Sequence, residues 1–375
     1  MPGLFDPLSL RGLTLRNRIG VAPMCQYSAS DGVASDWHLV HLGARAVGGA
    51  GLIVTEATAV TPEGRISPDD LGLWDDRHIA PLERITAFIR SQGAASAVQL
   101  AHAGRKASRT PPWGSDGHGR ERGLTHAEGA WPLVGPSAIA MAGHDFPPPA
   151  ALDDAGIAAI VAAFVAAAVR AGHAGFDAIE VHAAHGYLAD SFTSPIANLR
   201  DDGYGGDLPG RVRLLREIAR AIRRVWPDAK PLIVRLSATD WRDDGWTIDD
   251  SVALAPLLAE DGVDLIDCSS GGVAPARIPV APGYQVALAE AIRTRGGIAT
   301  AAVGMITDAH QADTIVREGR ADIVLLGREM LRDPHWPQRA AIALDATACA
   351  RVPIQYATAW RGAGFGHQPL GVGGT

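Results

Sequence analysis

The chain has 375 residues, of which 47% are hydrophobic, so it is long enough to bury a large core. Its net charge is −7 with both signs interspersed, which excludes the basic surface typical of nucleic-acid-binding proteins. Three scattered cysteines, Cys25, Cys268 and Cys349, exclude a disulfide framework and a four-cysteine iron–sulfur site within the chain. No signal-peptide pattern is visible, and the apolar run 157–169 is too short to span a bilayer, so we expect a cytoplasmic protein that binds no membrane.

Short apolar runs rich in β-branched residues recur eight times along the chain. Their nearly continuous hydrophobicity is typical of strands buried on both faces of a parallel sheet. The runs are 18–24, 51–60, 94–100, 178–183, 231–238, 264–270, 298–303 and 321–326.

Helical patterns alternate with these runs, and Thr307 is expected to cap the helix that follows the seventh run. Eight alternations of strand and helix predict an α/β chain folded as a single (β/α)8 barrel domain over residues 1–375. The helical patterns are 37–47, 78–90, 153–171, 211–225, 247–260, 284–295, 307–318 and 333–344.

A doubly wound open sheet is the alternative to the barrel. That fold typically has a glycine-rich turn immediately after an early strand, and this turn binds a dinucleotide. The glycines at 48–51 instead precede the second run, so the barrel is favoured.

Three segments do not fit a minimal barrel. The segments 8–11 and 13–16, on either side of Gly12, predict a hairpin that caps the bottom of the barrel. The segment 106–149 is a long loop after the third strand, and a loop of that length is usually a lid or a small subdomain. The tail over about 350–375 is rich in glycine but carries aromatic residues, which suggests that it docks onto another surface.

The end of the fourth run carries the strongest chemical signal. Active sites of barrels lie at the C-terminal ends of the strands, and His182, His185 and Tyr187 leave the fourth strand there. Two imidazole N–H groups can hold one carbonyl or nitro oxygen, and a tyrosine hydroxyl can deliver a proton. Two alternatives remain open: histidines bonded to the backbone beside a packing tyrosine, or a metal site completed by Glu180.

The ends of the seventh and eighth runs carry a second signal, because these two loops often bind phosphate in barrels. Gly304 and Gly327 allow backbone N–H groups to approach an anion, and Arg328 adds a guanidinium. The alternative is that both glycines only serve ordinary turns.

Six motifs resemble those of the old yellow enzymes, in particular the subclass called thermophilic-like, and the resemblance extends from residue 4 to about 360. Taken together they are specific, whereas each alone is only moderately so. The motifs are LFDPL at 4–8, APMCQY at 22–27, QLAHAGRK at 99–106, HAAHGYL at 182–188, SPIANLR at 194–200 and DGYGG at 202–206.

This resemblance implies a barrel that binds FMN noncovalently and takes hydride from NADPH or NADH. By resemblance, Arg235 lies near N1 of the flavin, and Cys25 lies beside the flavin and tunes its potential. The residues implied to bind FMN are Pro23, Met24, Cys25, Ala57, Gln99, Arg235, Gly304, Met305, Gly327 and Arg328.

The resemblance also implies an activity, the ping-pong reduction of the C=C bond of α,β-unsaturated carbonyl or nitro compounds. His182 and His185 would bind the substrate oxygen with help from Tyr27, and Tyr187 would be the proton donor. Trp360 would reach the substrate site of a neighbouring protomer, in a homodimer or homotetramer. A metal-dependent barrel lyase and a flavin-binding module without turnover are the alternative functions.

Overall fold

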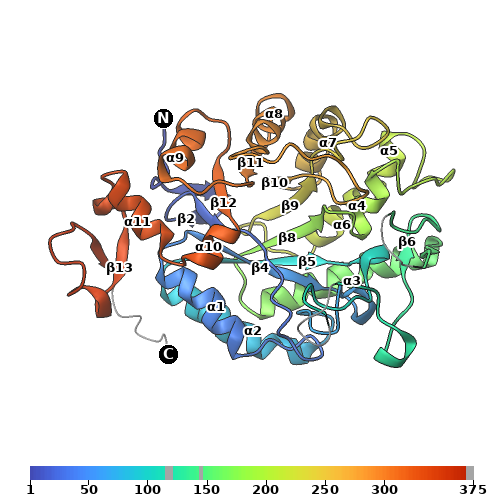
Figure 1. Cartoon of the computed structure of the whole chain (residues 1–375), viewed down its shortest axis with the longest axis horizontal. Coiled ribbons are helices and arrows are strands. Elements are labelled where there is room, and N and C mark those ends of the chain that lie inside the picture. The colour runs from blue at the N-terminus through green and yellow to red at the C-terminus, as the bar shows by residue number, and fades with distance from the viewer. Residues whose placement is uncertain (115–120, 143–146, 369–375) are drawn as a thin grey trace.

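The computed structural model describes residues 1–114, 121–142 and 147–368. Its centre is a closed barrel of eight parallel strands surrounded by helices (Figure 1), as the sequence predicts, so the open-sheet alternative is wrong. In their order around the barrel the strands are β3 (Ile19–Val21), β4 (Leu52–Ala59), β5 (Ala95–Ala101), β8 (Ala178–Ala183), β9 (Leu232–Ser237), β10 (Leu265–Ser269), β11 (Ala299–Ala302) and β12 (Ile323–Leu326).

The main helices pack on the outside of the strands and bury one apolar face each. In α6, for example, Leu215, Ile218 and Ile222 recur at helical spacing and are fully buried. The helices of this layer are α1 (Asp36–Val47), α2 (Ile79–Ser91), α3 (Asp154–His173), α6 (Arg213–Arg223), α7 (Ile248–Glu260), α8 (Val286–Gly296), α9 (Ala309–Arg317) and α11 (Trp336–Ala343).

The predicted hairpin is present at the bottom of the barrel. It consists of β1 (Leu8–Leu10) and β2 (Leu13–Leu15), which pair antiparallel. Leu8, Leu10 and Leu15 pack into one apolar cluster with residues of the barrel strands, such as Leu52 and Ile233. This cluster closes the bottom, so a ligand can enter only from the opposite end of the barrel.

Several local predictions are wrong. The cap of α9 is Asp308 and not Thr307, because the Asp308 carboxylate itself accepts the Gln311 N–H at 2.9 Å. The apolar run 157–169 extends into the 20-residue α3, which by length and mean hydropathy alone could cross a membrane. Its buried face instead packs against α6, α2 and β5 of the barrel.

Three short helices were not predicted: α4 (Leu188–Thr193), α5 (Leu208–Arg211) and α10 (Arg328–Arg332). The helices α4 and α10 begin directly after the strand ends that carry Tyr187 and Gly327. Tyr187 and Gly327 are the N-cap residues of these helices, and each lines a cavity at the barrel mouth.

The long loop and the tail lie at opposite sides of the barrel (Figure 1). The described part of the loop after β5 contains β6 (Val134–Gly135), which pairs with β7 (Ala150–Ala151). The tail contains β13 (Arg351–Pro353), which pairs with β14 (Gly366–Gln368) beside α11. Residues 115–120 and 143–146 of the loop and 369–375 of the tail lie outside the described residues.

Candidate active site

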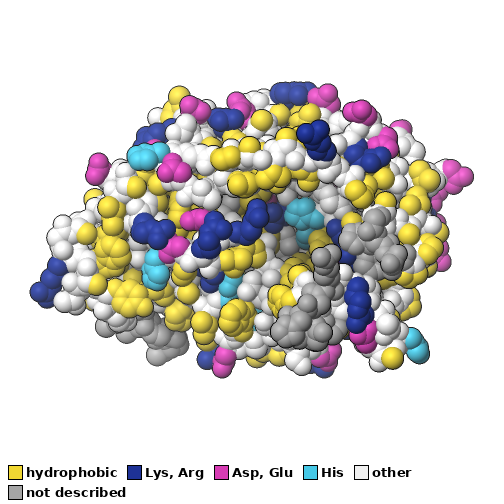
Figure 2. All heavy atoms as spheres, in the orientation of Figure 1, with side chains coloured by type: hydrophobic (Ala, Val, Ile, Leu, Met, Phe, Trp, Pro, Cys, Tyr) yellow, Lys and Arg dark blue, Asp and Glu magenta, His cyan; other side chains and the backbone are white. Residues whose placement is uncertain are grey.

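A cavity of about 290 Å³ opens beyond the C-terminal ends of β11 and β12. Gly304 and Met305 after β11 line it, as do Gly327 and Arg328 after β12, so the structure brings together the residues predicted to bind phosphate. A Cβ on Gly327 would meet only Met24 Sδ, at 3.7 Å, so the missing side chain leaves this space open. Figure 2 shows this face hollowed at its centre, with Lys or Arg side chains on the rim and a histidine inside.

Charged side chains lie inside the barrel, below the mouth. Arg235 of β9 lines the cavity, and its Nε lies 3.1 Å from Asp267 Oδ2 of β10. Next to them, Gln99 of β5 donates from Nε2 to Glu180 Oε1 of β8 at 2.7 Å. Burial and the neighbouring Asp267 raise the pKa of Glu180 to about 8, although Arg235 opposes this shift. Arg235 is thus a buried cation. It pairs with Asp267 and can also stabilise a negative charge on a ring system bound above it.

The two histidines lie together at the end of β8. Their ring centroids are 5.2 Å apart, and the His182 ring is 4.9 Å from that of Tyr187. Burial, and then the charge of Arg235, lower the pKa of both histidines well below the usual value, so both are neutral at pH 7. His182 Nδ1 is buried without a hydrogen-bond partner among the described residues.

Ser269 of β10 orients His185, since its Oγ lies 2.6 Å from His185 Nε2. When this hydroxyl donates to Nε2, the imidazole proton lies on Nδ1, which can then donate to a ligand. The backbone of His185 is held in the left-handed region, at φ 63°, by the Ser237 hydroxyl on its N–H and by Lys106 Nζ on its carbonyl, at 2.9 and 2.7 Å. This conformation turns the side chain into the mouth.

The loop after β3 brings Cys25 and Tyr27 to the same place. Cys25, Tyr187 and Ala57 of β4 pack on one small apolar cluster. Burial raises the pKa of the Cys25 thiol well above its usual value, so the thiol is neutral. Trp113 of the long loop packs edge-on against Tyr27 with centroids 5.4 Å apart, so this loop covers the mouth at that point.

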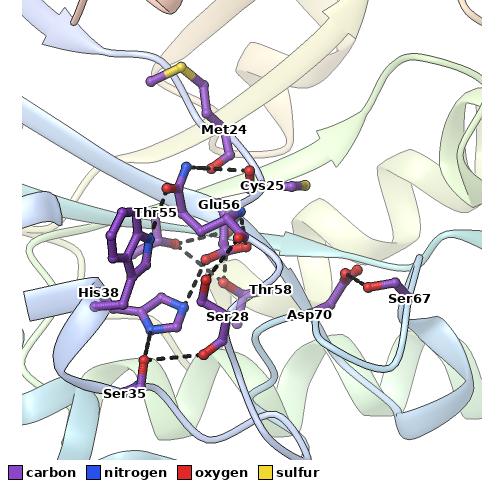
Figure 3. A network of polar contacts seen from close by, with 12 residues as sticks. Met24, Cys25, Ser28, Ser35, His38, Thr55, Glu56, Thr58, Ser67 and Asp70 are labelled. Carbon is purple, nitrogen blue, oxygen red and sulfur yellow. Dashed lines mark hydrogen bonds and ion pairs between the residues drawn. The ribbon is translucent and has the colours of Figure 1, made fainter. Parts of the chain in front are cut away.

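A buried contact between a carboxylate and an imidazole, which has no counterpart in the prediction, holds this loop (Figure 3). Glu56 Oε2 accepts the Gln26 N–H at 2.8 Å, and Glu56 Oε1 lies 3.0 Å from His38 Nε2. His38 Nδ1 accepts the Ser35 N–H at 3.0 Å, so the ring proton lies on Nε2, facing Glu56. An acidic residue inside an apolar run is the sequence signal that marks Glu56, and it marks Asp267 in the same way.

Two further expectations concern a metal site and Trp360. Among the described residues, no three His, Cys, Asp or Glu side chains form a metal-binding group, because Glu180 bonds Gln99 and His185 bonds Ser269. The metal-lyase alternative therefore loses its ligand set. Trp360 packs on Phe365 and on the core of its own chain, and its reach into a neighbour stays a prediction.

These residues fit FMN. The open cradle at Gly304, Gly327 and Arg328 suits the phosphate, and the buried Arg235 suits an anionic ring. Gln99 retains its amide oxygen for the N–H of a pyrimidine edge, because only its Nε2 is bonded to Glu180. The cavity and the neutral histidines above it thus place the chain among the flavin-dependent oxidoreductases built on an eight-stranded barrel.

The comparisons with known proteins agree with this class. The model of the NADH:flavin oxidoreductase / NADH oxidase family matches residues 3–346. The chain belongs to this family, which is that of the old yellow enzymes, and its cofactors are FMN and NAD(P)H.

Relatives and solved structures cover nearly the whole chain. It is 48% identical over 360 residues to an NADPH dehydrogenase of Geobacillus thermodenitrificans, covering 96% of this chain and 98% of the relative. It is 44% identical to an NADPH dehydrogenase of Bacillus subtilis, covering 95% and 99%. Morphinone reductase has a similar structure, with a TM-score of 0.76 at 29% identity over 91% of this chain and 90% of the other.

Proposed function

We propose that this FMN-dependent NAD(P)H oxidoreductase is an ene-reductase that reduces the C=C bond of α,β-unsaturated carbonyl or nitro compounds. The observation that carries the proposal is the pair of neutral imidazoles, His182 and His185, next to Tyr187 at the barrel mouth. Two neutral N–H donors suit an oxygen that gains negative charge as the bond is reduced.

When bound, FMN would supply the hydride transfer of a ping-pong cycle between NAD(P)H and the substrate. The protein binds and orients the reactants. His182 and His185 hold the substrate oxygen, and Tyr27 closes over it beneath Trp113. Burial, and then the neighbouring Cys25, raise the pKa of Tyr187 well above its usual value, so Tyr187 keeps its proton until the substrate Cα takes it.

In this proposal Arg235 and the residues of the phosphate cradle would hold FMN, and Pro23, Met24 and Ala57 would contact its ring. Cys25 touches the same region and changes the flavin potential without forming a covalent bond. A protonated, half-buried thiol suits that role better than the role of a nucleophile.

The expected result for the purified protein is a yellow flavin spectrum that NADPH bleaches and 2-cyclohexen-1-one restores. The Tyr187→Phe variant should still be bleached by NADPH, but its reoxidation by the enone should slow by about 10²-fold or more, because the proton donor is lost. If NADPH reduces the flavin but no enone or nitroalkene reoxidises it, the protein is still an NAD(P)H oxidoreductase and the proposed ene-reductase activity is wrong.

We also propose that the chain forms a homodimer or homotetramer in which the tail completes a neighbour's site. The position of the tail supports this proposal. Strand β13 of the tail and strand β6 of the long loop lie at opposite sides of the barrel (Figure 1), and Tyr356 of the tail is exposed. Deleting residues after Arg351 should raise the KM for the enone several-fold while FMN content stays the same. Sedimentation that shows a fully active monomer at the assay concentration would contradict the shared site.

A further inference from the structure

Asp70 is a buried carboxyl group beside the proposed active site that the mechanism above does not use. Its exposed fraction is 1%, and it lies in the loop between β4 and α2. Its Oδ1 accepts the Ser67 hydroxyl (Figure 3) and its Oδ2 accepts the Ile66 N–H, both at 2.7 Å. The Ser67 N–H is a third donor to this carboxylate, and three donors still leave one of its roughly four lone-pair sites to bind a proton.

Asp70 and Tyr187 line the same small cavity. Its volume of about 10 Å³ is close to the space that one water molecule needs. The other residues around it are glycine or apolar, so Asp70 and Tyr187 are the two polar side chains in its lining. The remaining lining residues are Ala57, Ala59, Gly64, Ile66, Ala101 and Ala103.

The environment of Asp70 suits a group that gains and loses a proton near neutral pH. Burial raises the pKa of Asp70 to about 7, and repulsion from Glu56 adds to the rise, while the Ser67 hydroxyl and the Ile66 N–H oppose it. The charge of Asp70 in turn raises the pKa of Cys25, Tyr27 and Tyr187. A proton on Asp70 therefore makes it easier for Tyr187 to give up its own.

The proposed reaction needs such a group, because NAD(P)H supplies a hydride but each turnover also consumes one proton. A tyrosinate left at the buried Tyr187 is unfavourable. We propose that Asp70 relays the solvent proton to Tyr187. As the Tyr187 O–H proton moves to the substrate Cα, the Asp70 O–H bond breaks and its proton passes to a water in the shared cavity, which gives a proton to the Tyr187 oxygen. The Asp70 carboxylate then takes a proton from solvent. This relay rests on the proposed ene reduction.

The test follows the reoxidation of reduced enzyme by 2-cyclohexen-1-one and by menadione in a stopped-flow instrument. The Asp70→Asn variant should react with the enone more slowly than the parent, by about tenfold or more. This loss is a part of the roughly 10²–10⁴-fold rate acceleration that a general acid contributes. The parent rate with the enone should fall as the pH rises through about 7, and the variant should lack this fall. Menadione should react equally with both proteins, because a reduced quinone oxygen can take its proton from water after release.

Three variants separate the relay from a structural role. Asp70→Glu keeps an acid and should recover most of the rate. In a Tyr187→Phe background, Asp70→Asn should cause no further loss. Asp177→Asn is the matched control, because Asp177 also accepts a backbone N–H and a hydroxyl, both from Ser96 at 2.9 and 3.0 Å, but at the bottom of the barrel. It should react with the enone like the parent.

An infrared titration gives a readout that does not depend on turnover. The parent should show a protonated-carboxyl band that titrates near pH 7 and is absent from Asp70→Asn. The relay is overturned if Asp70→Asn keeps the parent rate with the enone while Tyr187→Phe is slow, or if it slows enone and menadione equally. A parent enzyme that menadione reoxidises and the enone does not would overturn the proposed ene reduction, and the relay with it.

Discussion

The double substitution His182→Ala/His185→Ala is expected to slow enone reduction by the reduced enzyme by about 10²–10³-fold or more, the loss typical of one oxyanion donor. Both imidazoles are neutral and buried, and one of them, His182, has an Nδ1 without a partner among the described residues. Removing both leaves the substrate oxygen without its two imidazole donors. Reoxidation by the enone in a stopped-flow instrument, with FMN content measured beside it, checks this result.

The controls for this experiment distinguish lost donors from lost packing. His182→Asn/His185→Asn keeps two N–H donors and should recover part of the rate. His41→Ala removes another buried neutral imidazole, one that stacks on Trp37 of α1, and should leave the rate unchanged. The affinity for a phenol, titrated by its absorbance with the oxidised flavin, should fall only in the alanine pair. If the double alanine variant reduced the enone at the parent rate, these histidines would have no part in the mechanism.

The barrel could be predicted from the sequence because its signal is local and repeated. Each of the eight apolar runs overlaps one strand of the barrel. The first run is too long, since β3 ends at Val21 and the chain then leaves the sheet to place Cys25 and Tyr27, the latter at φ 50°. A run of apolar residues does not show where the hydrogen bonds of a strand end.

The main site residues could be predicted for a related reason, because parallel strands of a barrel end at one mouth. This rule brings His182, Arg235 and Gly304 together without knowledge of their distances. The rule could not find Asp70 or the role of Lys106. Asp70 lies in an irregular loop, and only the folded chain places it beside Tyr187. Lys106 acts through two backbone carbonyls, those of His185 and Gly272, and no sequence pattern marks that contact.

Glu180, Asp267 and Arg235 show how the chemistry of the mouth is tied to the stability of the barrel. Residues that are buried in apolar strands usually avoid charge, yet here two acids and one arginine lie side by side. Arg235 is 6% exposed and lowers the pKa of both acids, against the larger effect of burial. Its positive charge therefore stabilises the two carboxyl groups beside it, and the proposed role toward the flavin would use the same charge.

The substitution Arg235→Met is accordingly expected to destabilise the holoprotein by about 3–5 kcal/mol at pH 8, because it leaves a buried acid without its cation. The pKa values of Glu180 and Asp267 are already raised by burial and rise further without Arg235. When a carboxyl has a higher pKa in the folded state than in the unfolded state, the free energy of unfolding falls as the pH rises between the two values. The loss should therefore be smaller at pH 5.5, where the folded variant holds these protons.

Urea unfolding at pH 5.5 and at pH 8, with flavin release followed in parallel, checks both expectations. Arg295→Met is the matched control, because Arg295 pairs with Asp249 at 2.6 Å with both side chains more than half exposed. Losing that pair should cost about 0–1 kcal/mol at either pH. Arg235→Met/Asp267→Asn removes the uncompensated charge and should recover part of the stability at pH 8. An equal loss for Arg235→Met at both pH values would show that its packing, and not its charge, stabilises the barrel.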